Sequence, residues 1–165
     1  MPRRRYYRRP VRVVAAKKKW ATNIIQKDFA YPTVSELLVE NSAQNASPTP
    51  VVLKVGNFKI RGDGTATASG AVNVFLLYLP ESWGTTETDL NSVVLSHPEW
   101  IMGWTTLNIN RNSSSSGSEI NNFSISTRLK RNLNSGDKVL LFIQPIGNSI
   151  NFNIAFTCQF WTCAN

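Results

Sequence analysis

The chain has 165 residues with 18 Lys and Arg against 10 Asp and Glu, a formal net charge of +8. The first nineteen residues hold nine of these cations and no acidic residue, so residues 20–165 carry nine cations against ten acidic groups, a net charge of −1. This distribution excludes a uniformly basic domain, and the lack of any apolar stretch near about 20 residues excludes a membrane-spanning helix.

The N-terminal segment 1–19 is interpreted as a basic arm that binds a polyanion, joined to a single domain, 20–165. Arginine offers phosphate a planar fork of donors, and aromatic rings interleaved with cations suit single-stranded nucleic acid. Basic clusters of this kind also serve as nuclear localisation signals. The predicted nucleic-acid-binding residues of the arm are Arg3, Arg4, Arg5, Tyr6, Tyr7, Arg8, Arg9, Arg12, Lys17, Lys18 and Lys19.

The first half of the domain reads mainly as strands separated by polar segments. Residues 20–32 are a candidate strand, 33–40 are ambiguous between a short helix and a strand, and 41–50 are a loop rich in Asn, Ser and Pro. Residues 51–60 predict a strand, and 61–70 a flexible turn built around Asp-Gly. The most apolar strand is predicted at 71–80.

The second half continues the pattern. A polar loop is expected over 81–96, a strand opened by Pro98 over 97–110, and a low-complexity loop over 111–119. Strands are predicted at 120–129 and 138–146, with a turn at 132–137 between them. The last strand alternates with period two, which gives it one buried face. That face carries Phe152, Ile154, Phe156, Cys158 and Phe160.

Seven strands and one ambiguous segment, without long helical patterns between them, favour an all-β antiparallel sandwich or closed barrel. Eight strands in two sheets would form a jelly roll. Cys158 and Cys163 lie five residues apart on one strand, so they point to opposite faces and cannot bridge each other. Free thiols fit a reducing compartment.

No catalytic, metal or cofactor site is expected. His97 is the sole histidine, and although Glu99 could reach it, neither a poised serine motif nor a phosphate-binding glycine loop occurs. Arg61, Gly62 and Asp63 spell the tripeptide that integrins bind, within the predicted turn, where glycine and aspartate are equally explained by turn chemistry.

A second basic cluster consists of Arg128, Lys130 and Arg131. Such a cluster is most simply a solvated face, and a contact with nucleic acid or with a neighbouring subunit is the alternative.

Several stretches carry a resemblance to a known family. The arm PRRRYYRRP is similar to those of circovirus and cyclovirus capsid proteins. The domain resembles capsid proteins of the wider group of circular, Rep-encoding single-stranded DNA viruses, although the chain is short for a circovirus capsid protein. The stretches concerned are VGNFKIRGD, VNVFLLYLPE, HPEWIMGW, STRLKRNLNSGDKVLLF and NFNIAFTCQF.

The resemblance implies an eight-stranded jelly roll, assembled as a T=1 icosahedral shell of about sixty copies. It implies arms that face inward onto single-stranded circular DNA and that also recruit the host nuclear import machinery. The protein would be located in the virion and, during assembly, in the host nucleus, with a host receptor that the residues do not identify.

Two other classes of protein share some of these features. A cellular nucleic-acid-binding β-protein, ribosomal or organellar, would carry a basic extension too, but its domain would normally be basic, whereas this one has a net charge of −1. A secreted lectin-like jelly roll would require a signal peptide, which the sequence does not predict.

Overall fold

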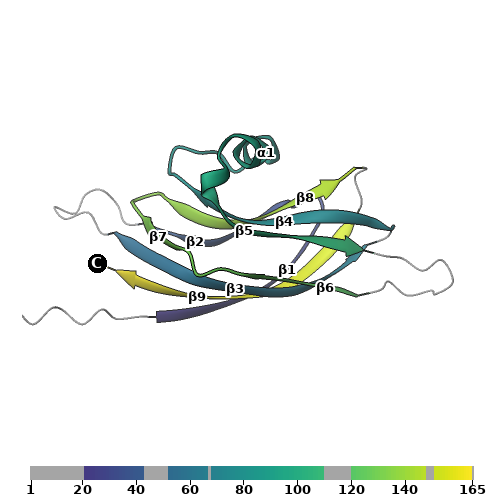
Figure 1. Cartoon of the computed structure of the whole chain (residues 1–165), viewed down its shortest axis with the longest axis horizontal. Coiled ribbons are helices and arrows are strands. Elements are labelled where there is room, and N and C mark those ends of the chain that lie inside the picture. The colour runs from purple at the N-terminus through teal and green to yellow at the C-terminus, as the bar shows by residue number, and fades with distance from the viewer. Residues whose placement is uncertain (1–20, 43–51, 67, 110–119, 148–150, 165) are drawn as a thin grey trace, which may run out of the picture.

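A computed structural model describes residues 21–42, 52–66, 68–109, 120–147 and 151–164. The described residues form two antiparallel sheets packed face to face, with one helix outside the second sheet (Figure 1). Sheet I contains β1 (Ala21–Ala30), β9 (Phe152–Ala164), β3 (Leu53–Ala66), β6 (Asn121–Ser126) and β7 (Lys130–Leu133). Sheet II contains β2 (Ser35–Glu40), β8 (Lys138–Ile146), β4 (Gly70–Leu79) and β5 (Ile101–Ile109).

The strands pair in a nested order. The first strand pairs with the last, β2 pairs with β8, β3 pairs with both β6 and β7, and β4 pairs with β5. From the outermost pair inward, the pairs lie alternately in sheet I and sheet II and end with β4–β5 in sheet II, as in one long hairpin wrapped around the core. This arrangement is a jelly roll, with β6 and β7 sharing the position beside β3. The predicted fold class is therefore confirmed.

The main core lies between the sheets. The five inward residues predicted for the last strand are all buried there, which confirms the period-two pattern. The phenyl rings of Phe58 and Phe160, on neighbouring strands of sheet I, stack within this core with centroids 5.0 Å apart. Cys158 is buried among these residues, and burial raises the pKa of its thiol to about 12. Cys163 is buried outside this cluster, and neither cysteine forms a disulfide, as predicted.

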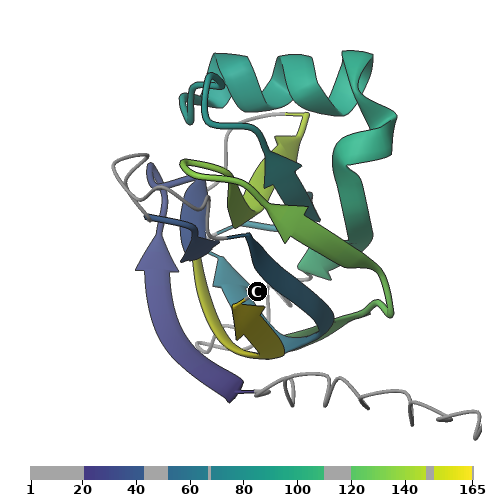
Figure 2. The same ribbon diagram turned by 90° about the vertical axis from the view of Figure 1, so that its left-hand side faces the viewer.

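A second apolar cluster lies on the other side of sheet II. Helix α1 (Glu87–Ser96) and the short 3₁₀ helix η1 (Pro98–Trp100) follow β4, and α1 lies across the outer face of this sheet (Figures 1 and 2). Leu90 and Val93, one helical turn apart, are fully buried against Phe75, Leu77 and other residues of the sheet.

The expected polar loop at 81–96 is therefore wrong. The side chain of Thr86 accepts a hydrogen bond from the backbone N–H of Asp89, which caps the helix, and Glu87 and Asp89 place negative charge in its first turn. The strand expected from residue 97 also begins later, at Ile101, because Pro98 starts η1 instead.

The expected turn at 61–70 is also wrong, because β3 continues to Ala66 and is paired on both sides. Gly62 and Gly64 serve close packing within the sheet. A Cβ atom on Gly62 would lie 2.7 Å from the Phe123 ring, and one on Gly64 would lie 2.5 Å from Leu107. The glycines that suggested a turn are required where side chains of the core cross the strand. Arg61, Gly62 and Asp63 thus lie within a strand, not in a protruding loop.

Of the remaining boundaries, the ambiguous segment at 33–40 contains a strand, β2. The predicted strand at 120–129 ends at Ser126, and a second short strand, β7, follows it. The predicted loops at 41–50 and 111–119 fall largely or wholly outside the described residues.

Candidate nucleic-acid interface

The outer face of sheet I has no helix over it among the described residues, and it lies on the side of the sandwich opposite α1 (Figure 1). Along β9, the side chains between the buried positions point to this face, among them Ala155, Thr157 and Gln159. The strand register places Lys59 opposite Gln159 and Arg61 opposite Thr157. Both cations are therefore on the outer face and exposed.

A β-bulge in β3 brings a third cation to the same face. Gly56 pairs with Trp161 and Lys59 with Gln159, so that two residues, Asn57 and Phe58, face the single residue between them on β9. Without the extra residue, strict alternation would place Lys54 and Lys59 on opposite faces. The bulge residue Asn57 has φ +54°, a left-handed conformation that asparagine tolerates better than most residues.

Lys130 of β7 is the fourth cation of this face. It pairs with Gly56, and its aliphatic stem lies above that glycine on the outer side, beside the Trp161 ring. We call these residues the basic face: Lys54, Lys59, Arg61 and Lys130. Arg128 is exposed in the link between β6 and β7, at the edge of the face.

The basic face is restricted to one end of sheet I. Asp28 and Asp63, each opposite Ala155, lie in a row across the sheet farther along β3. The cationic end is where β3 and β1 begin and β9 ends, because Ala21 pairs with Thr162. In the sequence only Trp20 separates Ala21 from Lys19, the last residue of the basic arm, so the arm joins the domain at the cationic end of this outer face.

The opposite side of the domain is acidic. Residues 80–100, which include α1 and η1, contain four carboxylates and no lysine or arginine. They are Glu81, Glu87, Asp89 and Glu99. A domain whose net charge is close to zero therefore separates its charges into a cationic sheet face and an anionic helical side.

The three residues of the predicted second basic cluster do not lie on one face of the sheet. Arg128 and Lys130 are exposed, whereas Arg131 points inward and is half-buried. Its guanidinium lies over the Tyr78 ring, 5.4 Å from the centroid, and one of its N–H groups donates to the backbone oxygen of Glu99. These contacts tie β7 to β4 and η1. Arg131 therefore lies on the other side of β7 from Lys130, and a contact of any of the three residues with nucleic acid stays a prediction.

Tyr78 belongs to a polar network at the same place. Its hydroxyl donates to Asp137 Oδ2 at 2.9 Å, and the buried Asp137 carboxylate also accepts from the backbone N–H groups of Glu81 and Asn134. Burial, and then the hydrogen bond to Asp137, raise the pKa of Tyr78 to about 12. The network holds the β7–β8 turn against the end of β4.

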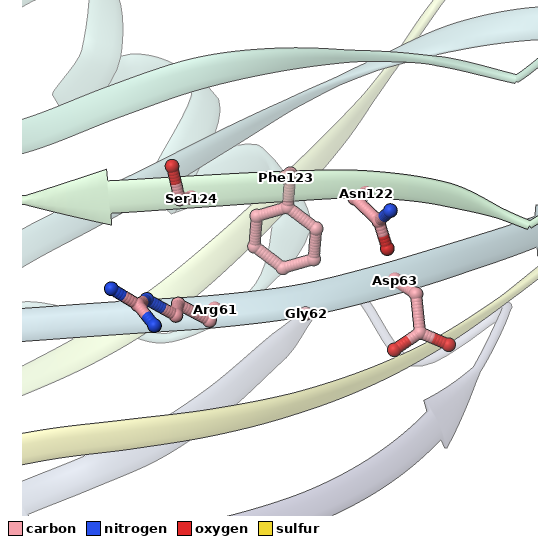
Figure 3. A pocket seen from close by; sticks show the side chains of 6 residues that line it. All are labelled: Arg61, Gly62, Asp63, Asn122, Phe123 and Ser124. Carbon is pink, nitrogen blue, oxygen red and sulfur yellow. The ribbon is translucent and has the colours of Figure 1, made fainter.

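A hollow of about 460 Å³ lies on the outer face around Gly62 (Figure 3). Arg61 and Asp63 lie at its two ends, and Asn122 and Ser124 of the neighbouring strand β6 complete it. The Asp63 carboxylate would repel a phosphate group here. Nucleic acid is therefore better accommodated at the other end of the face.

His97 lies away from this face. Its ring stacks on Trp100 with centroids 4.1 Å apart, contacts Trp83 edge-on, and lies 3.1 Å from Glu99 Oε1. The pKa of Glu99 is lowered by a hydrogen bond from its own backbone N–H and then by the contact with His97. His97 ends α1 and begins η1, so a structural role accounts for it.

The described residues contain no group of three or more His, Cys, Asp or Glu that could hold a metal ion. None of the helices among them is long and apolar enough to cross a membrane.

The predicted residues of the arm, Arg3 to Lys19 with Tyr6 and Tyr7, lie outside the described residues, and their role stays a prediction. Sequence reasoning missed Lys54, Lys59 and Arg61 as members of one face. Their spacing of five and then two residues contradicts a regular strand. The signal that could have revealed them is the Gly-Asn pair at 56–57, since a glycine inside a strand pattern suggests a bulge.

The fold and this interface define a jelly-roll β-sandwich with one open cationic face. No protein-family model matches the chain, and no curated protein matches it. Among solved structures, it is similar to the decameric BFDV capsid protein, with 8% sequence identity over 88% of this chain and 99% of that chain, and a TM-score of 0.25. A structural similarity this weak says nothing about the function of this chain.

Proposed function

We propose that this chain is a viral coat protein that assembles into a small closed shell and packages single-stranded circular DNA. The observation that carries the proposal is the continuity of charge: an arm with nine cations joins a near-neutral jelly roll at the cationic end of its open face. Phosphate binding that begins on the arm would continue on Lys59, Lys130 and their neighbours.

The separation of charge also suits assembly. Copies arranged with sheet I inward would bring all arms and basic faces to the interior, where the genome lies. The acidic helical side would then point away from the DNA, which avoids repulsion between carboxylates and phosphates. The resemblance of the arm and of the domain stretches to capsid proteins of circular single-stranded DNA viruses supports the same function. Recruitment of the nuclear import machinery by the arm is part of this proposal.

The proposal is tested by expressing the full chain and measuring particle size by light scattering and electron microscopy. We expect closed particles far larger than the 18.4 kDa chain. A monodisperse monomer at every salt concentration and pH tested would contradict the shell. If that monomer still bound nucleic acid, the cellular nucleic-acid-binding protein would be the better interpretation.

Nucleic-acid content is measured on the same particles from the ratio of absorbance at 260 and 280 nm. Replacing the nine arm cations with glutamine should remove most of the nucleic acid. The matched triple variant Lys59→Gln, Arg61→Gln, Lys130→Gln should remove less, and should lower the slope of log affinity against log salt by about 2 for a single strand. Unchanged content in both variants would contradict packaging by these residues.

A further inference from the structure

A second hollow lies on the outer face of sheet I, at the cationic end where the arm joins. Its volume is about 200 Å³. The register sets its walls, because Thr22 of β1 pairs with Trp161 of β9, and Lys59 of β3 pairs with Gln159 of β9. The residues that line it are Thr22, Asn57, Lys59, Gln159, Phe160 and Trp161.

Trp161 forms one wall because Gly56 leaves room for its ring. A Cβ atom on Gly56 would lie 2.9 Å from Cζ2 of Trp161 and 3.0 Å from Cγ of Lys130. The indole and the stem of Lys130 therefore meet above the glycine. Trp161 remains partly exposed, and it has a cation on either side, Lys59 across the hollow and Lys130 beyond the ring.

This combination of groups matches the chemistry of single-stranded nucleic acid. Proteins hold single strands by stacking bases on aromatic rings while cations meet the phosphates. The side-chain amides of Asn57 and Gln159 and the hydroxyl of Thr22 offer donors and acceptors to the edge of a base. No carboxylate of the described residues lines this hollow, in contrast to the one beside Asp63. In a duplex the bases are stacked on one another, so their faces are closed to the ring.

We propose that this hollow is a nucleotide subsite, which takes one base of a single strand against Trp161 with its phosphates between Lys59 and Lys130. The subsite would fix the path of the strand where it passes from the arm to the sheet. The inference deepens the proposed function and relies on it only for the class of ligand, a nucleic acid; it does not require that a shell forms.

The test compares two fluorescent strands of about twelve nucleotides, oligothymidylate and an abasic strand with the same number of phosphates. Binding to the full chain is followed by anisotropy, at protein concentrations at which light scattering shows no assembly. We expect wild type to prefer oligothymidylate on the order of tenfold, because one stacked base contributes about 1–3 kcal/mol. In a chain that also carries Tyr6→Leu and Tyr7→Leu, so that the arm offers no tyrosine ring for stacking, Trp161→Leu should abolish this preference and leave abasic affinity unchanged. Lys59→Gln should weaken both strands alike.

Two controls separate stacking from a loss of structure. Trp161→Phe keeps an aromatic ring and should keep most of the preference. Trp104→Leu removes a tryptophan that is 62% exposed on β5 of the other sheet, and it should change nothing. In the Tyr6→Leu, Tyr7→Leu background, a preference that survives Trp161→Leu, or equal affinity for the two strands when Trp161 is present, would overturn the subsite. Shell formation is measured separately, so base preference without shells would refute the proposed coat function and retain the subsite.

Discussion

The two sheets of this sandwich share a core, but a helix covers the outer face of one sheet and no described helix covers that of the other. Sheet II presents apolar residues on its outside, including Phe75 and Leu77, and the connection between β4 and β5 supplies α1 to cover them. Sheet I presents lysine, arginine, glutamine and threonine together with Asp28 and Asp63, and no element of the described residues covers it. The outer face of sheet II therefore contributes to stability, whereas the outer face of sheet I is accessible to a ligand as far as the described residues show.

The largest loss of stability is expected where α1 packs against sheet II. Leu90→Ala should lower the free energy of unfolding by about 2–5 kcal/mol, because Leu90 is fully buried between the helix and the sheet. Leu95→Ala is the matched control on the same helix, since Leu95 is 83% exposed, and it should cost almost nothing. Urea denaturation of both variants provides the measurement. Equal losses would mean that α1 does not pack as described.

A smaller effect is expected at the network that joins β4 to the β7–β8 turn. Tyr78→Phe removes the hydrogen bond to the Asp137 carboxylate and should cost on the order of 1.5 kcal/mol at neutral pH.

The same residue predicts a pH dependence. The pKa of Tyr78 is raised from 10.0 to about 12, so the folded state keeps its proton more tightly than the unfolded state. This contribution to stability is complete below pH 10 and is lost as pH rises toward about 12. Thermal melts over this range should show a steeper fall for wild type than for Tyr78→Phe. Parallel curves would contradict the assignment.

The smallest change in the free energy of unfolding is expected at Asn57, the bulge residue of β3. Asn57→Ala places a Cβ-bearing residue without a polar side chain at φ +54° and should cost about 1 kcal/mol, whereas Asn57→Gly should be neutral or slightly stabilising. Chemical denaturation distinguishes the two. If alanine were tolerated as well as glycine, the bulge that aligns Lys54 with Lys59 would not depend on a left-handed residue.

The sequence predicted much of the fold because most strands follow simple rules. The last strand alternates without interruption through its first nine residues, and β8 begins and ends where expected, at Lys138 and Ile146. Helix α1 was missed because its apolar residues are few and its polar residues suggest a loop, although Thr86 and Asp89 are spaced as an N-terminal cap. The glycines of β3 suggested a turn, because their role depends on residues distant in sequence, such as Phe123 and Leu107.

The candidate site was predicted only in part. A cationic arm is evident from composition, whereas a cationic face requires the register of four strands. Lys130 was identified and Arg131 was grouped with it, but the adjacent positions point to opposite sides of β7. The hollow beside Trp161 combines residues from β1, β3 and β9, and no local pattern joins them.

The nested pairing of the strands determines the order in which they can pair during synthesis. On the ribosome, β1 is made first, yet its partner β9 is made last, and β9 also lies between β1 and β3. Sheet I therefore cannot close until residues 152–164 have been made, and among the described strands β4 and β5 are the partners that lie nearest to each other in sequence. A chain that stopped before residue 152 would lose the middle strand of the very sheet that presents the cations. The complete cationic face would then exist only in chains that contain β9, so under the proposed function a shorter nascent chain could not bind nucleic acid through this face.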